Sequence, residues 1–188
     1  MKKIISFSTK EELNIYMSPQ RQQLLRVMHI NGRPMTAKML ADKLCISASS
    51  ASHHISKLMQ LKLIEEDHTE VINGITAKYF RLADVTVSVG IHKDDGLFDE
   101  KNALVQNFLQ NTLSGLLRGK EYARSIGIPE DDMKNLGDCI GGVVHLKPED
   151  ARALLELIRK FTDEHEAYSE GTEPWEFAVI FYKSGFES

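Results

Sequence analysis

The chain has 188 residues, a length that suits one domain or two small ones. Hydrophobic residues make up 42% and charged residues 27%, which is ordinary globular usage and argues against wholesale disorder. The longest apolar run, residues 177–182, is far shorter than the ~18 residues of a membrane helix, and Cys45 and Cys139 match no zinc or redox spacing. These features exclude membrane transport, disulfide scaffolds and zinc fingers. Without a recognisable secretory signal, we expect a cytoplasmic protein.

The two halves of the chain carry opposite charge. Residues 1–90 hold 12 Lys and Arg against 8 Asp and Glu, a net of +4. Residues 91–188 hold 11 against 19, a net of −8, and together these give the overall −4. A mildly basic half followed by an acidic half suggests that only the first half meets a polyanion.

Local signals in the first half predict a short strand at 3–7 and then four helices. A capping-box pattern at Ser8 to Glu11 opens the first helix, which runs to about Met17. Proline at the next helix start, followed by glycine and proline after residue 31, brackets a helix over 19–29. Thr36 caps a helix over 37–44, and a three-residue connection leads to Ser47, the expected cap of a helix over 48–61.

A β-hairpin is predicted immediately after these helices. The dipeptide Asn73-Gly74 interrupts an extended stretch that begins at Leu63, and this dipeptide favours a tight turn whose central residues have positive φ. The return strand over 75–82 alternates, with Phe80 and Leu82 on one face. Two helices joined by a short turn and followed by a hairpin are typical of a winged helix-turn-helix.

The second half predicts a smaller α/β region. One more strand near 85–89 precedes a polar linker at 93–96, and a long amphipathic helix follows over 98–118. Strands are expected at 139–146 and 175–182, on either side of a helix over 148–165. The prediction is therefore an α+β chain with an N-terminal winged helix-turn-helix domain over 1–92 and a C-terminal dimerisation or effector region over 97–188.

The stretch from Thr36 to Leu58, with its Ser52-His53-His54 block, closely resembles the helix-turn-helix of ArsR-type winged-helix transcriptional regulators. Residues 18–25 are similar to the opening helix of that family, and residues 73–82 are similar to its wing. The resemblance covers residues 17–82. It implies a DNA-binding transcriptional regulator, and we expect a repressor that binds double-stranded DNA as a homodimer on a pseudo-palindromic operator.

Helical geometry selects the residues of the 48–61 helix that would contact DNA. When Ile55 is set toward the core, Ala48, Ala51, Leu58 and Met59 also point inward, and a polar face points outward. Short hydroxyl, imidazole and amide groups on that face can reach base edges, and Lys57 suits a phosphate. With one cation from the wing, the candidate DNA-binding residues are Ser49, Ser50, Ser52, His53, Ser56, Lys57, Gln60 and Lys78.

The acidic wing sequence, with Glu65, Glu66, Asp67 and Glu70, predicts only a modest approach of the wing to DNA. It also leaves open an alternative, a winged-helix protein-interaction module that no longer binds DNA. An enzyme in the C-terminal half is a further alternative, which we do not expect because no acid–base pair or nucleophile set stands out.

The expected regulator needs no cofactor and no metal. Metal-sensing ArsR-type regulators carry paired cysteines in the first helix of the motif, whereas this chain has only Cys45, at the turn. A small-molecule effector, if there is one, is expected in the C-terminal region. Its pocket would lie between helix and sheet, lined by Trp175, Phe177, Phe181 and Tyr182. The stripe of the 98–118 helix, from Leu104 to Leu117, is expected to contribute to a dimer interface.

Overall fold

The computed structural model describes residues 2–90 and 95–185. The chain forms two compact units, Met1–Val105 and Gln106–Ser188, which are called unit 1 and unit 2 below. Within the described ranges, no helix combines the length and apolar character needed to cross a bilayer.

Unit 1 contains four helices at the predicted places, α1 (Lys10–Met17), α2 (Pro19–Asn31), α3 (Ala37–Leu44) and α4 (Ala48–Gln60). The capping box of α1 lies one residue later than the sequence pattern suggested. Thr9 accepts from the amide of Glu12, and the Glu12 carboxylate accepts from the amides of Ser8 and Thr9, which lowers the pKa of that carboxyl. Gly32 ends α2 in the left-handed conformation, as its position predicts.

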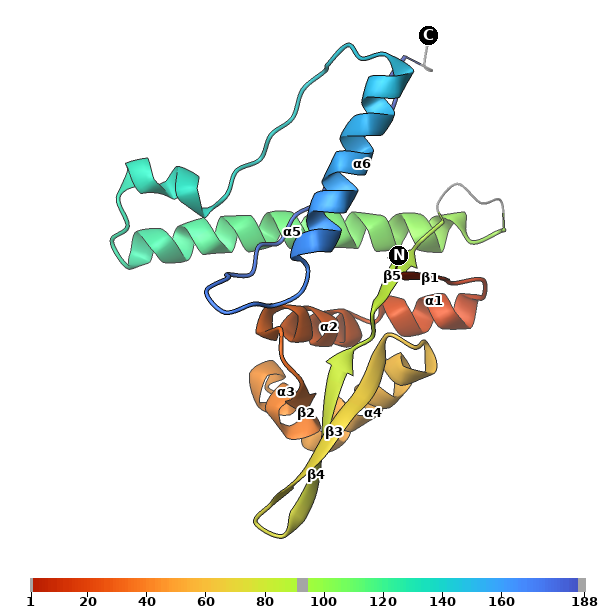
Figure 1. Cartoon of the computed structure of the whole chain (residues 1–188), viewed down its shortest axis with the longest axis vertical. Coiled ribbons are helices and arrows are strands. Elements are labelled where there is room, and N and C mark those ends of the chain that lie inside the picture. Colours follow the sequence, from red (N-terminus) through yellow and green to blue (C-terminus); the bar gives the residue numbers. More distant parts are fainter. Residues whose placement is uncertain (1, 91–94, 186–188) are drawn as a thin grey trace. The chain divides into compact units, whose positions relative to one another are not determined.

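The strands of unit 1 form two small sheets. In one, β1 (Lys3–Ser6) pairs in parallel with β5 (Val85–Ser88). In the other, β4 (Ile75–Leu82) lies between β3 (Ile64–Ile72) and the two-residue strand β2 (Met35–Thr36), which the sequence pattern did not reveal. Figure 1 shows β3 and β4 as a long ribbon that projects beyond α3 and α4. At its tip, Asn73 and Gly74 have φ values of 50° and 78°, as the turn prediction requires.

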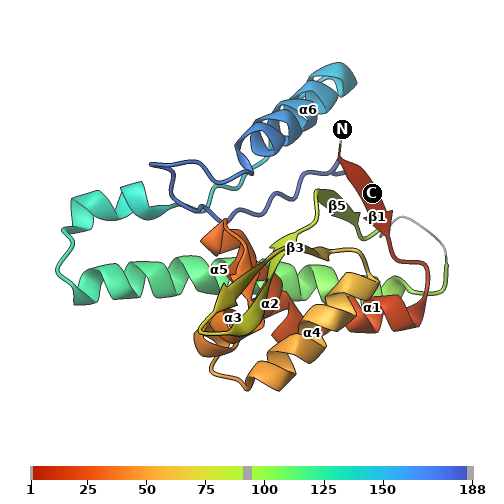
Figure 2. The same cartoon turned by 60° about the horizontal axis from the view of Figure 1, so that its bottom comes forward.

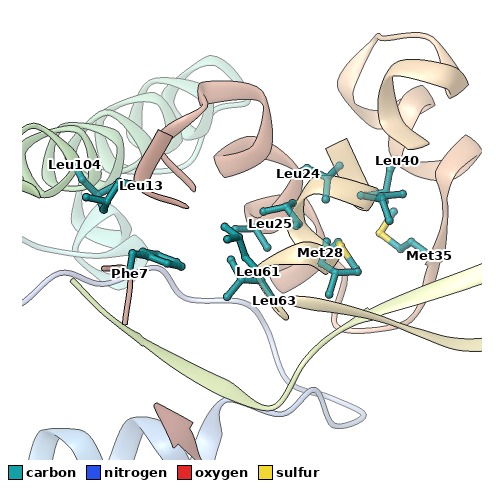
Figure 3. Packing of buried hydrophobic residues seen from close by; sticks show 13 residues of the cluster. Phe7, Leu13, Leu24, Leu25, Met28, Met35, Leu40, Leu61, Leu63 and Leu104 are labelled. Carbon is teal, nitrogen blue, oxygen red and sulfur yellow. The ribbon is translucent and has the colours of Figure 1, made fainter. Parts of the chain in front are cut away.

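The hydrophobic core of unit 1 connects all four helices with the sheets. Leu25 of α2 lies beside Leu61 and Leu63, at the end of α4 and the start of the hairpin, and Leu24 and Met28 belong to the same cluster (Figure 3). The outward-pointing Tyr79 and Arg81 alternate with Phe80 and Leu82, which pack on this core. Burial of these side chains fixes where α4 and the hairpin lie relative to α2 and α3.

The boundary between the units falls inside α5 (Phe98–Ser125). Residues 93 and 94 of the linker predicted at 93–96 lie outside the described ranges. Leu104 belongs to the core of unit 1. Lys101 is fully buried, and its Nζ donates to the Gly90 carbonyl at 3.2 Å and to Asp95 Oδ2 at 2.5 Å. These contacts hold the first turns of α5 in unit 1. The helix also continues seven residues beyond its predicted end at Arg118, through Gly119.

Unit 2 comprises the rest of α5, a 3-10 helix η1 (Glu130–Leu136) that the sequence pattern did not reveal, and α6 (Pro148–His165) at its predicted place. The strands predicted at 139–146 and 175–182 are wrong for the single chain, because both stretches are coil and belong to neither of the sheets that the described residues form. Figure 1 shows them as plain coil leading into and out of α6. Strands need neighbours to satisfy their backbone groups, and the described residues of unit 2 provide none.

Candidate nucleic-acid interface

The connection between α3 and α4 is a tight turn that is closed by backbone and side-chain hydrogen bonds. Thr36 caps α3 by accepting from the Met39 amide at 3.1 Å. Cys45 adopts a left-handed conformation, with φ at 53°, and the Ile46 amide donates to the Ala41 carbonyl at 3.0 Å. Ser47 then caps α4 by accepting from the Ser50 amide at 3.1 Å. Both helix starts therefore follow the predicted capping residues.

One face of α4 is anchored in the core and the other is open. Ala51, Ile55 and Leu58 are buried, at 0%, 2% and 0% exposure. Met59 is 36% exposed, so it lies at the edge of the core and not inside it. Figure 2 shows α4 along the outer edge of unit 1, with its length accessible from outside. An exposed helix held rigidly on its opposite face can enter a groove without distorting the domain.

The open face carries most of the predicted DNA-binding residues. Ser49, His53, Ser56 and Gln60 are exposed along α4, and Lys57 is half-buried beside them. Ser49 Oγ lies 3.0 Å from Ser47 Oγ, and Lys57 Nζ donates to Gln60 Oε1 at 3.4 Å. The face thus presents hydroxyl, imidazole, amide and ammonium groups along a single helix, the mixture that suits base edges and phosphates.

Two of the predicted serines are engaged within unit 1. Ser50 is half-buried and its hydroxyl lies 3.4 Å from His54 Nε2, while the hydroxyl of Ser52 donates to the Ala48 carbonyl at 2.9 Å. Burial, together with nearby Arg21 and His53, lowers the pKa of His54. The lowered pKa favours the neutral imidazole of His54.

The β3–β4 hairpin, which was predicted to be the wing, carries a series of ion pairs. Lys78 Nζ lies 2.9 Å from Glu66 Oε2, and Arg81 pairs with both Glu65 and Asp67. These pairs weaken the repulsion that the acidic residues would exert on DNA, and one of them occupies Lys78, the hairpin cation that was expected to contact DNA. Lys78 is 60% exposed and would have to exchange Glu66 for a phosphate to contact DNA.

A further cation lies at the end of α4, although the sequence pattern did not single it out. Lys62 is exposed and follows the helix directly, with φ at 59°. A lysine just past a recognition helix is a plain sequence signal for a phosphate contact. Its left-handed backbone conformation could not be foreseen from the sequence.

The pocket expected in the C-terminal region needs a sheet as one of its walls, and residues 106–185 form no sheet in the single chain. Trp175, Phe177 and Tyr182 are instead more than half exposed. Within the described ranges, no three His, Cys, Asp or Glu side chains gather as metal ligands would, and Cys45 and Cys139 are both exposed thiols.

Comparison with known proteins adds little to this geometry. No protein-family model matches the chain, and no curated protein matches it either. Among solved structures, the chain is similar to a possible transcriptional regulator from Methanosarcina mazei Go1, with 12% identity over 58% of this chain and 82% of the other. The TM-score of that pair is 0.34, a level of similarity that does not establish a shared fold.

Proposed function

We propose that the chain is a sequence-specific DNA-binding transcriptional regulator of ArsR-like winged helix-turn-helix type. In this proposal α3 and α4 form the helix-turn-helix, β3 and β4 form the wing, and the protein acts as a dimer on a pseudo-palindromic operator. It binds and does not catalyse.

The polar outer face of α4 carries the proposal. The helix is capped by Ser47, fixed by the buried Ile55 and Leu58, and open on the side of His53 and Ser56. A helix in this position is the one that enters the major groove in helix-turn-helix proteins. One module covers few base pairs, so two copies on two half-sites give the specificity that a regulator needs.

The decisive experiment is selection of duplexes from a random DNA pool, followed by binding measurements on the selected site with the His53→Ala, Lys57→Ala double variant. Loss of a base contact and of a phosphate contact each weakens binding by about 1–3 kcal/mol, so the dissociation constant should rise at least about tenfold. The slope of binding against salt should fall by about one because one phosphate contact is lost.

A matched control removes the same two side-chain types from another helix. His165→Ala with Lys160→Ala changes two exposed residues of α6 and should leave DNA binding unchanged. Both double variants should unfold like the parent because none of the four side chains is buried in the core, and substitutions outside the core alter stability by roughly 0.5 kcal/mol or less. Equal operator binding by the parent and the His53, Lys57 variant would remove α4 as the recognition helix.

The ion pairs within the wing favour a second candidate function, that of a winged-helix module that binds another protein. Its basis is that Lys78 and Arg81, the cations of β4, already have carboxylate partners. A mildly basic DNA-binding domain should still bind random duplex weakly at low salt. Absence of any duplex binding at low salt, with a folded protein, would favour this second function.

A further inference from the structure

The described part of unit 2, residues 106–185, has no hydrophobic core of its own. Of the seventeen buried apolar residues in the described ranges, only Ala123 and Met133 lie in unit 2. The 18-residue α6 has no buried residue, although Leu157 and Phe161 are large apolar side chains on its surface. A folded unit must bury apolar area to offset the loss of conformational entropy, so unit 2 is incomplete as a single copy.

The unburied side chains concentrate in the two extended stretches that flank α6. In the first, 139–146, Ile140 and Val143 are 93% and 77% exposed. In the second, 175–182, Trp175, Ile180 and Tyr182 are 63%, 66% and 76% exposed. Both stretches are rich in β-branched or aromatic residues and nearly free of charge, although residues 106–188 as a whole carry 15 acidic against 9 basic residues. Near-continuous apolar runs of this kind are typical of strands that are covered on both faces.

The order strand-like segment, helix, strand-like segment provides two strands, which are too few for a stable sheet. A second copy would add two identical segments and make a four-stranded sheet, with an α6 from each copy available to cover it. Glu176 is the only Asp, Glu, Lys or Arg in the two segments, so they match one another in character. The acidic remainder of unit 2 would attract a basic partner, and these apolar segments do not suit such a partner.

The exposed area is large enough for such a pairing. Six aromatic side chains of unit 2 are between 52% and 76% exposed: Phe108, Tyr122, Phe161, Trp175, Phe177 and Tyr182. At ~150–250 Å² per aromatic side chain, they leave roughly 500–900 Å² uncovered. A stable interface buries about 800 Å² on each partner, so burial of these side chains alone approaches the requirement.

We propose that residues 139–146 and 175–182 are strands of a β-sheet that is completed by the same residues of a second copy. Unit 2 then reaches its folded state only in the dimer. This pairing would be the dimer interface of the regulator proposed above. It does not depend on DNA binding and can be tested without DNA.

The test compares Ile180→Lys with Ile75→Lys in the full chain, by sedimentation velocity at micromolar concentration. Both isoleucines are exposed in the single copy, at 66% and 73%, but Ile75 lies at the tip of the wing in unit 1. The parent and Ile75→Lys should sediment as dimers. Ile180→Lys should be monomeric, or its dimer should dissociate at a concentration at least about tenfold higher, because a buried lysine would lack a partner.

Amide hydrogen exchange of the parent protein gives a second readout that does not depend on the variant folding. Amides of 139–146 and 175–182 should be protected at dimer-forming concentrations and should lose protection on dilution. A parent that is monomeric at tens of micromolar overturns the proposal. So does a dimer in which these amides exchange freely, or protection that persists in the monomer, which would mean that the sheet closes within one chain.

Discussion

His68 is a single side chain on which the charge of the wing depends. Its Nδ1 lies 2.6 Å from Asp67 Oδ2, its Nε2 lies 3.4 Å from Glu70 Oε1, and its ring stacks on Tyr79 at 4.4 Å. The hydrogen bond to Asp67 raises the pKa of His68 above its ordinary value of about 6.5, and Glu70 acts in the same direction. Protonated His68 therefore offsets part of the acidic charge of β3.

The pH dependence that follows has a definite sign. Because the pKa of His68 is higher in the folded than in the unfolded chain, the stabilisation is complete below about pH 6.5 and disappears as pH rises through the raised pKa. Ring proton shifts followed by NMR should titrate above 6.5 in the parent and closer to 6.5 in Asp67→Asn. The His68→Gln variant identifies the resonance. A His68 that titrates identically in the parent and in Asp67→Asn would show that Asp67 does not hold the proton.

The side chains of the candidate site also show where sequence reasoning stops at this scale. Helical periodicity placed His53 and Ser56 on the open face because their direction depends only on position along α4. It did not foresee that Ser50 bonds to His54 or that Lys78 bonds to Glu66, since both depend on rotamers and on neighbours that folding brings close. Whether these residues contact DNA stays a prediction.

At the scale of the elements, the hairpin and α5 each contain a glycine, but only the one in the hairpin has a backbone conformation that favours glycine. Gly74 has φ at +78° with open space where a Cβ would lie, so only the backbone disfavours a side chain there. Gly119 lies within α5, also with open space around it and no positive φ. Gly74→Ala should lower the free energy of unfolding by about 1–2 kcal/mol. Gly119→Ala should raise it by about 0.5–1 kcal/mol because alanine favours the helix.

Thermal unfolding followed by circular dichroism checks both changes. The melting temperature should fall for Gly74→Ala and rise for Gly119→Ala, although the chemical change is the same. A fall of equal size in both would mean that Gly119 has a packing role that the open space around it does not indicate.

The elements that sequence reasoning predicted are those whose signals are local. Caps at Thr36 and Ser47 and the Asn73-Gly74 turn mark α3, α4 and the hairpin within a few residues. The segments 139–146 and 175–182 have an equally clear strand pattern, yet they form no strand in the single chain. A strand also needs a partner that local sequence does not name, and β2, only two residues long, was missed for the same reason.

At the scale of the whole molecule, the distribution of buried residues predicts that unit 1 can fold alone and that unit 2 cannot. The core of unit 1 uses residues from Phe7 to Leu104 and none from unit 2. A fragment of residues 1–110 should therefore unfold cooperatively and sediment as a monomer. Circular dichroism and sedimentation on this fragment check both statements, and a broad, non-cooperative transition would show that unit 1 needs unit 2 to fold.

The buried Lys101 also constrains which sequences can adopt this fold. Its ammonium group has no access to water and depends on Asp95 and on the Gly90 carbonyl for its hydrogen bonds. Loss of the carboxylate alone would leave a cation inside the protein without its counter-charge, whereas replacement of both residues by apolar ones would remove the conflict. Positions 95 and 101 are therefore coupled, because a substitution at one is tolerated only with a compensating substitution at the other. In diverging copies of this chain, they should be inherited or exchanged as a pair.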